Sequence, residues 1–185
     1  MKFSYITFLI SIFIMSFGLP LKAQLPTDYL NTRNHRPTLD TSVNSEKNDN
    51  QDSNSSKQLI DELLEEASTH IGKRYRAGGK GPNQFDCSGF SSYVFRKFGI
   101  NLNPSSSTQY QQGQKVSMDE LRKGDLVFFT RRSSGNTVGH VGIVTNVDKN
   151  NGTFKFIHAS NTGITISEYE GYYKNTYVGA RRIIQ

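Results

Sequence analysis

The sequence predicts an α+β domain, in which helices come first and the strands of an antiparallel sheet follow. Apolar residues recur at helical spacing over residues 59–71 and again over residues 90–98. From residue 124 onward, short β-rich runs alternate with turn signals. Residues 57–185 have the size of one ordinary domain, so we expect N-terminal helices packed on a C-terminal sheet of about five to six strands.

The N-terminus has the layout of a secretory signal peptide. Lys2 precedes an apolar run over residues 5–17, and Ala23 stands before Gln24. The run is shorter than the roughly 20 residues of a membrane-spanning helix, so we predict cleavage after Ala23 and no stable membrane span afterwards. An uncleaved anchor is the alternative. The expected location is the periplasm, the cell envelope or the medium.

Residues 24–56 differ in composition from the rest of the chain. They are rich in Asn, Ser, Thr and Asp and have few aliphatic side chains. Such a segment buries too little apolar surface to offset the entropy lost on ordering, so we predict a disordered polar linker.

The net charge of +6 belongs to the predicted domain, because residues 1–56 carry five basic and five acidic side chains. The basic residues are dispersed and accompany no nucleic-acid-binding motif, so we expect no nucleic acid partner. The positive charge could instead serve contact with an anionic polymer of the cell envelope, or it could simply belong to a solvated surface.

The first predicted helix covers residues 59–71, with Ser55 and Ser56 as candidate N-caps. Its role is structural, and we assign no chemistry to His70 near its end. The glycine-rich loop 72–83 follows, and it is suited to form a pocket wall with Tyr75 as its polar tip. A half-buried amphipathic Tyr75 without a role is the alternative.

Cys87 is the only cysteine in the chain and therefore has no internal disulfide partner. Phe90, Val94 and Phe98 mark the buried face of a helix that ends at Gly99, so Cys87 lies in its first turn. A helix N-terminus lowers a thiol pKa and favours a nucleophilic thiolate; a small buried apolar side chain is the alternative. Asp86 either caps this helix or contacts a substrate amine.

A short capped helix is expected between Pro104 and Gly113. Asp125 begins a strand and has a turn role, and the polar loop 131–137 is placed to rim a cleft. The predicted strands cover residues 126–129, 139–144, 154–158, 164–166 and 177–183.

Two of these strands carry histidines. His140 can take the proton of the Cys87 thiol, which would store the pair as thiolate and imidazolium, and later protonate a leaving amine. His158 lies on the next strand, beyond a turn at residues 148–152, and can hold the His140 ring in one tautomer. A zinc site is the weaker alternative, because cysteine is scarce and the histidines are far apart in sequence.

These motifs together resemble the NlpC-type cell-wall cysteine peptidases, a papain-like family. The resemblance extends over residues 59–184 and implies a peptidase domain at 57–185, with Cys87 as nucleophile, His140 as base and His158 as third polar residue. It further implies that Tyr75 lies near the oxyanion, that Asp86 and Ser88 hold the substrate, and that no metal or cofactor is needed. The matching motifs are YRAGG at 75–79, DCSGF at 86–90, GDLVFF at 124–129, HVGI at 140–143, FIHA at 156–159 and VGARR at 178–182.

The resemblance implies an exported peptidoglycan hydrolase that cleaves stem peptides at the γ-D-glutamyl-diaminopimelate bond, in intact wall or in soluble muropeptides. Another acyl transfer on the same fold, such as an amidase or a toxin-like effector, and a non-catalytic wall-binding module are the alternatives. Two departures stand out: Lys123 replaces a common proline, and the segment between His140 and His158 is long.

Overall fold

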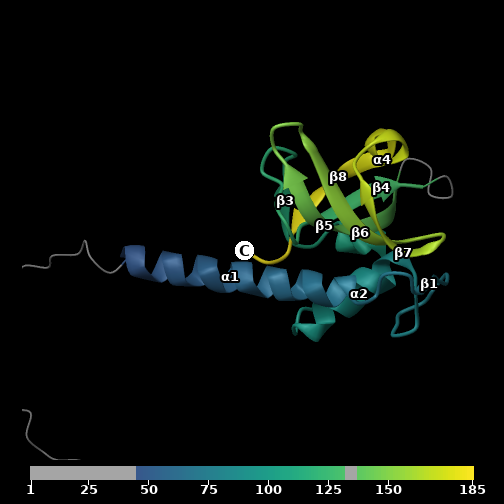
Figure 1. The fold of residues 1–185 in the computed structure, drawn as a ribbon, viewed down its shortest axis with the longest axis horizontal. Helices are drawn as coiled ribbons and strands as arrows, with labels where there is room; N and C mark the ends of the chain where they lie inside the picture. The colour runs from purple at the N-terminus through teal and green to yellow at the C-terminus, as the bar shows by residue number, and fades with distance from the viewer. Residues whose placement is uncertain (1–44, 132–136) are drawn as a thin grey trace, which may run out of the picture. The chain divides into compact units, whose positions relative to one another are not determined.

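The structure is a computed structural model that describes residues 45–131 and 137–185. The predicted signal peptide and residues 24–44 of the predicted linker lie outside these residues. The described residues belong to one compact unit. The predicted α+β class is confirmed, because three of the four helices in the described residues precede a six-stranded antiparallel sheet (Figure 1).

Helix α1 spans Ser45–Ser68, so residues 45–56 are helical and the prediction of a disordered linker is wrong for them. Ser55 and Ser56 are consequently not N-caps. The segment contains no Gly or Pro, the residues that most disfavour a helix, although most of its residues are Ser, Asn and Asp, which are weaker helix formers. Its polar turns therefore extend the amphipathic helix whose residues Ile60, Leu63 and Ala67 are buried.

Helix α2 spans Cys87–Lys97, as the spacing of its apolar residues predicts. Asp86 caps its start, and it ends before Gly99, whose φ of 75° is in the left-handed region that glycine favours. The short predicted helix is α3, Ser106–Gln109, where Ser105 and Thr108 form a reciprocal capping box.

The main sheet has the strand order β3-β8-β4-β5-β6-β7, and each neighbouring pair is antiparallel. The sequence did not predict β3 or helix α4, which are polar and too short for a periodic pattern. The strands are β3 (Gln114–Val116), β4 (Leu126–Thr130), β5 (Val138–Asp148), β6 (Thr153–Ser160), β7 (Gly163–Glu168) and β8 (Tyr177–Arg182), with α4 (Gly171–Thr176) before β8. A small parallel pair is made by β1 (Arg74–Tyr75) and β2 (Gln84–Phe85).

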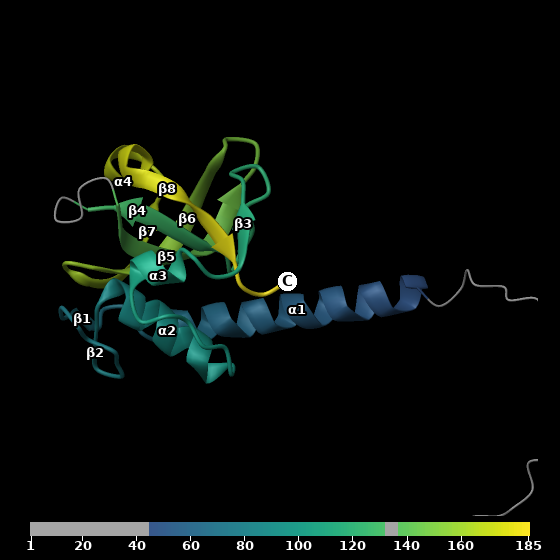
Figure 2. The same ribbon diagram turned by 180° about the vertical axis from the view of Figure 1, so that it is seen from behind.

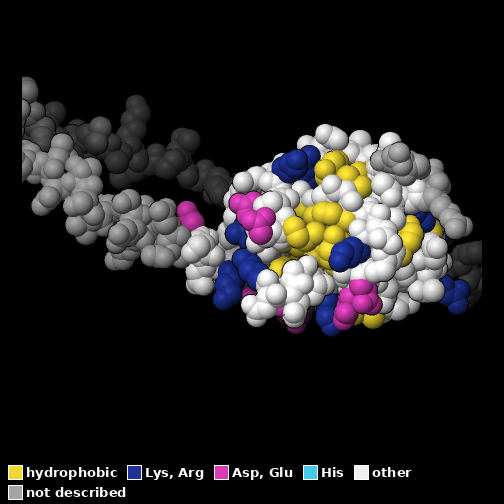
Figure 3. Space-filling model, turned by 90° about the horizontal axis from the view of Figure 1, so that it is seen from above, with side chains coloured by type: hydrophobic (Ala, Val, Ile, Leu, Met, Phe, Trp, Pro, Cys, Tyr) yellow, Lys and Arg dark blue, Asp and Glu magenta, His cyan; other side chains and the backbone are white. Residues whose placement is uncertain are grey.

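Two hydrophobic clusters hold these elements together. The first joins α1 and α2 to the sheet, and Figure 2 shows both helices on the same side of it. The second contains Phe129 and Phe156 from the sheet, with Tyr169, Tyr173 and Tyr177 packed against them. On the face seen in Figure 3, basic and acidic side chains are interspersed around hydrophobic ones, which agrees with the dispersed charge of the sequence.

No helix within residues 45–131 and 137–185 is both long and apolar enough to cross a membrane.

Candidate active site

Cys87 is the first residue of α2 and has only 6% of its surface exposed. The cap on this helix is Asp86, whose Oδ1 accepts the backbone N–H of Gly89 at 2.5 Å. A side chain at position 89 would collide with the carbonyl oxygen of Gly79, so glycine is required where the preceding loop crosses the helix. Asp86 and Gly89 are therefore both needed to form the start of α2, and this start holds the thiol of Cys87 in place.

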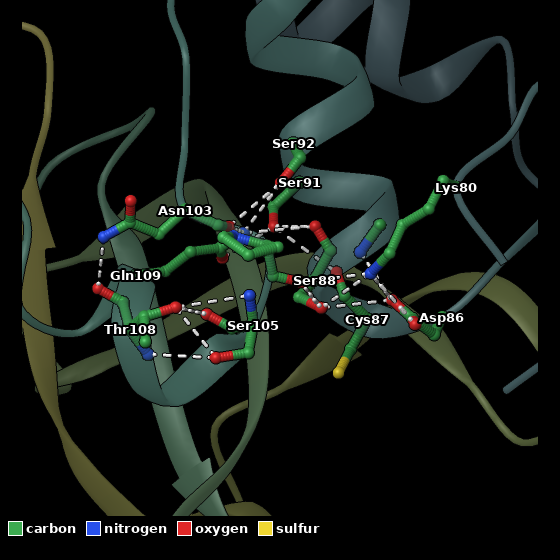
Figure 4. Close-up of polar contacts among 12 residues, drawn as sticks. Lys80, Asp86, Cys87, Ser88, Ser91, Ser92, Asn103, Ser105, Thr108 and Gln109 are labelled. Atoms are coloured by element: carbon green, nitrogen blue, oxygen red, sulfur yellow. Dashed lines mark hydrogen bonds and ion pairs between the residues drawn. The ribbon is translucent and has the colours of Figure 1, made fainter. Parts of the chain in front are cut away.

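Asp86 and Ser88, predicted to bind substrate, contact a lysine of the same chain (Figure 4). Lys80 Nζ lies 3.2 Å from Asp86 Oδ2, 3.4 Å from Ser88 Oγ and 3.1 Å from the carbonyl oxygen of Pro104. Ser88 Oγ also lies 3.1 Å from Asp86 Oδ1 and 3.0 Å from the Pro104 carbonyl oxygen, and its single O–H can donate to either. An ammonium group thus already occupies the oxygen atoms that the sequence assigned to a substrate amine.

The thiol of Cys87 lies against the backbone at the start of β5. Its Sγ is 4.0 Å from the carbonyl oxygen of Gly139, and the backbone N–H of Val141 hydrogen-bonds the sulfur. These two residues flank His140 in the chain. The structure therefore brings Cys87 to the strand position that carries the predicted base.

His140 and His158 are joined directly. Strands β5 and β6 are antiparallel neighbours, and the ring nitrogens His140 Nε2 and His158 Nδ1 lie 2.9 Å apart. Gly142 allows this approach, since a Cβ there would lie 2.5 Å from Phe156 Cδ2 and 3.2 Å from His158 Cβ. The predicted turn at residues 148–152 also forms, with Asp148 Oδ1 accepting the N–H groups of Asn150 and Asn151.

The far side of His158 meets two hydroxyl groups that the sequence did not indicate. Its Nε2 lies 2.9 Å from Ser167 Oγ and 3.3 Å from Tyr173 Oη. Ser167 belongs to β7 and Tyr173 to α4, so four elements hold the two histidines. No periodic or motif signal marks either hydroxyl, because their contact depends on how β7 and α4 return to the sheet.

Burial keeps these groups neutral. It lowers the pKa of His140 to about 3, with the nearby His158 and Arg131 adding to the effect, and it lowers the pKa of His158 to about 4. Burial and the charge of Asp86 raise the pKa of the Cys87 thiol. The thiolate–imidazolium pair expected from the sequence stays a prediction, and the burial of both groups works against it.

Arg131 is a residue near the site that the sequence did not single out. The hydroxyl of Tyr75 hydrogen-bonds its guanidinium group; the positive charge offsets a small part of the rise in the pKa of the Cys87 thiol and adds to the lowering of the pKa of His140. Arg131 thus contacts Tyr75 and lies near enough to the thiol for its charge to act on it. The sequence placed Arg131 only in a polar loop at the edge of a cleft, since a loop arginine has no spacing that identifies a partner.

Two other side chains have the structural roles that the sequence gave them. Asp125 is buried and accepts the backbone N–H of Arg122 at 2.9 Å in the turn before β4, and it also accepts two hydrogen bonds from Arg182, each at 2.9 Å, that the sequence did not predict. His70 is buried between Glu66 and Lys73. Within the described residues, no group of three or more His, Cys, Asp or Glu side chains is arranged to hold a metal ion.

A buried thiol at a helix start, set beside paired histidines of an antiparallel sheet, defines a candidate cysteine-nucleophile site. Residues 72–182 match the NlpC/P60 family, and the chain belongs to that family. The resemblance predicted from the sequence is thereby confirmed.

Several relatives have endopeptidase names. A probable endopeptidase p60 of Listeria grayi is 40% identical over 140 residues, which are 76% of this chain and 24% of the relative. Murein DD-endopeptidase MepS/Murein LD-carboxypeptidase of Escherichia coli is 39% identical over 125 residues, 66% of this chain and 62% of the relative. The chain thus corresponds to about a quarter of the Listeria protein.

Solved structures support the fold. A lipoprotein-like NLP/P60 family protein of Staphylococcus aureus has a TM-score of 0.61 and 33% identity, covering 69% of this chain and 42% of that one. The NlpC/p60 domain of the peptidoglycan hydrolase SagA has a TM-score of 0.52 and 28% identity, covering 65% of this chain and 96% of that domain.

Proposed function

We propose that this protein is a peptidoglycan hydrolase, a cysteine endopeptidase that cleaves stem peptides. The observation that carries the proposal is the thiol of Cys87 against the backbone on both sides of His140, whose ring is hydrogen-bonded to His158. Membership of the NlpC/P60 family and the endopeptidase names of relatives support it.

In the proposed mechanism, His140 takes the proton of the Cys87 thiol as sulfur attacks the amide carbonyl. General-base catalysis during attack fits the neutral resting groups better than a stored ion pair does. The oxyanion forms next to the start of α2, where the backbone N–H of Cys87 contributes a hydrogen bond. His140 then protonates the leaving amine, and water hydrolyses the thioester.

The proposed substrate contacts are Tyr75 near the oxyanion and Asp86 with Ser88 at a substrate amine. Because Lys80 holds Asp86 and Ser88 in the structure, a substrate ammonium has to displace Lys80 from them. Lys80 is about half exposed, with 48% of its side chain accessible, so its movement into solvent costs little.

Export is part of the proposal. Residues 1–23 are proposed as the signal peptide and residues 24–44 as a polar linker before α1, which leaves the peptidase domain in the periplasm, at the cell envelope or in the medium. Peptidoglycan is found only outside the cytoplasmic membrane, so an exported protein and this substrate are consistent with each other.

The proposed bond is the γ-D-glutamyl-diaminopimelate amide, and the name of the Escherichia coli relative makes the D,D-cross-link the second candidate. Digestion of purified peptidoglycan, followed by mass analysis of the released peptides, separates the two. Products that end at D-Glu support the first bond, whereas loss of cross-linked dimers with intact stems supports the second. Release of whole stem peptides from the sugar would instead identify an amidase.

A further inference from the structure

The role proposed for His140 determines which of its ring nitrogens carries a proton. To accept the thiol proton, a neutral His140 needs one bare nitrogen facing Cys87, and the other nitrogen has to be N–H. The nitrogen that contacts His158 is Nε2, at 2.9 Å from His158 Nδ1. Nε2–H of His140 therefore donates to a bare Nδ1 on His158.

His158 must then carry its own proton on Nε2, and that N–H needs an acceptor because His158 has no exposed surface. Ser167 Oγ lies 2.9 Å from this nitrogen, and Tyr173 Oη lies 3.3 Å from it. Either hydroxyl oxygen can accept this N–H, and Ser167 Oγ is the nearer of the two. The reverse direction would put a proton on the nitrogen of His140 that faces Cys87.

We propose that Ser167 is a positioning residue for this reaction, because its oxygen accepts Nε2–H of His158 and so keeps His140 in the tautomer that can accept the thiol proton. The inference rests on the proposed function of the site. Tyr173 is the weaker second acceptor, since its distance is longer. Ser167 touches neither substrate nor thiol and acts only through His158.

Two isosteric variants test the hydroxyl separately from packing. Both variants add one methyl group to the serine side chain. Ser167→Thr keeps the hydroxyl, whereas Ser167→Val has a methyl group in its place, so the two variants match each other in shape, and both residues suit a strand. We expect Ser167→Thr to stay within about twofold of the wild type in kcat, and Ser167→Val to lose about threefold to tenfold in kcat with KM unchanged, the effect of one hydrogen bond. The double variant Ser167→Val, Tyr173→Phe should lose more than Ser167→Val alone.

Two further measurements on the full-length protein do not depend on the substrate. The rate of iodoacetamide alkylation reports on Cys87 alone, because the chain has one cysteine. It should fall in Ser167→Val and not in Ser167→Thr. Nitrogen NMR of the imidazole rings should show His158 protonated at Nε2 in the wild type and a mixture of tautomers in Ser167→Val.

Equal kcat and equal alkylation rates for Ser167→Thr and Ser167→Val would overturn the inference, as would a His158 protonated at Nδ1 in the wild type. If the wild type cleaves no peptidoglycan peptide while the alkylation and NMR results agree with expectation, the proposed substrate is wrong and the role of Ser167 stands.

Discussion

His140 and His158 are neutral in the folded protein although free histidines titrate near pH 6.5. A third residue with a carboxylate would favour an imidazolium at His140, whereas His158 offers only a neutral ring. The site therefore relies on hydrogen-bond direction, from His140 to His158 to Ser167, rather than on a negative charge. This arrangement has a consequence for stability as well as for catalysis.

The stability of the protein should fall in mild acid. Because the pKa values of His140 and His158 are lowered to about 3 and about 4, the unfolded chain binds more protons than the folded one below pH 6.5. Their stabilisation is complete above pH 6.5 and is lost as the pH falls towards 4, by up to about 1.4 kcal/mol per pH unit for each histidine.

Urea unfolding at intervals between pH 7.5 and 4.5 measures this loss. The double variant His140→Gln, His158→Gln is the control and should show a much flatter profile. The pKa values of Asp119 and Asp148 are lowered from 3.8, so these two groups change the unfolding free energy mainly below pH 4.5, outside the range that is measured. A wild-type profile as flat as that of the control would contradict the neutral, buried histidines.

Lys80 offers a second test among single residues. Lys80→Met keeps the length of the side chain and removes the ammonium group from Asp86 and Ser88. Unfolding free energy should change by less than about 1 kcal/mol, because the ion pair is partly exposed. Cleavage of stem peptides with a free N-terminal amine, relative to N-acetylated ones, should rise by about twofold to fivefold, because displacing the partly exposed Lys80 costs the wild type less than about 1 kcal/mol.

The comparison of the two peptides is internal to each protein, so a small loss of active protein does not affect it. An unchanged preference in Lys80→Met would show that Asp86 and Ser88 do not contact the substrate amine and serve only the start of α2.

Among the elements, the β5–β6 pair depends on one residue without a side chain. Gly142→Ala would place a Cβ 2.5 Å from the buried ring of Phe156 and 3.2 Å from Cβ of His158. Because Phe156 is in the core, the strands have to separate, and we expect a loss of about 1–3 kcal/mol in unfolding free energy together with reduced activity.

The matched control is Gly152→Ala, at the tip of the same hairpin, where a Cβ meets nothing within 4 Å but φ is +59°. This variant should lose about 1 kcal/mol from backbone strain and keep its activity. Equal activity in the two variants, measured on the folded fraction by thermal melting and muropeptide cleavage, would argue against the importance of the His140–His158 spacing.

The junction of β4 and β8 is held by a buried ion pair. Asp125 has 1% of its side chain exposed and contacts Arg182 through both carboxylate oxygens. Asp125→Asn should cost about 3 kcal/mol, since it leaves the guanidinium without its charge partner. Glu168→Gln removes an ion pair with Lys155 in which both side chains are 53% exposed, and it should cost less than about 1 kcal/mol.

Chemical denaturation of the two variants beside the wild type makes the comparison. Similar losses in both would mean that Asp125 is solvated in solution and that its role at the strand start is only local.

At the scale of the whole molecule, local patterns predicted most of the fold. Helix α2 was predicted from the spacing of Phe90, Val94 and Phe98 and from the small residues after Asp86. The β-rich runs predicted five of the six strands of the main sheet. The predicted start of α1 was wrong, because composition indicates whether a segment can fold alone and not whether it can extend a neighbouring helix.

The candidate site was predictable only in part. Cys87, His140 and His158 stand in recognisable motifs, and neighbouring strands bring the histidines together. The contacts of Lys80, Arg131 and Ser167 depend on side chains that are not neighbours in the chain: Ser88 follows Lys80 by 8 positions, and Ser167 follows His158 by 9. No periodic pattern in the sequence predicts these side-chain contacts.

The central claim is that Cys87, with His140 as its base, cleaves peptidoglycan peptides. The most direct measurement is the cleavage rate of purified muropeptides by the wild type, Cys87→Ala and His140→Ala, with melting curves to show that each is folded. The account predicts that both variants lose about a thousandfold or more in rate while remaining folded. A folded Cys87→Ala variant that cleaves at the wild-type rate would contradict it.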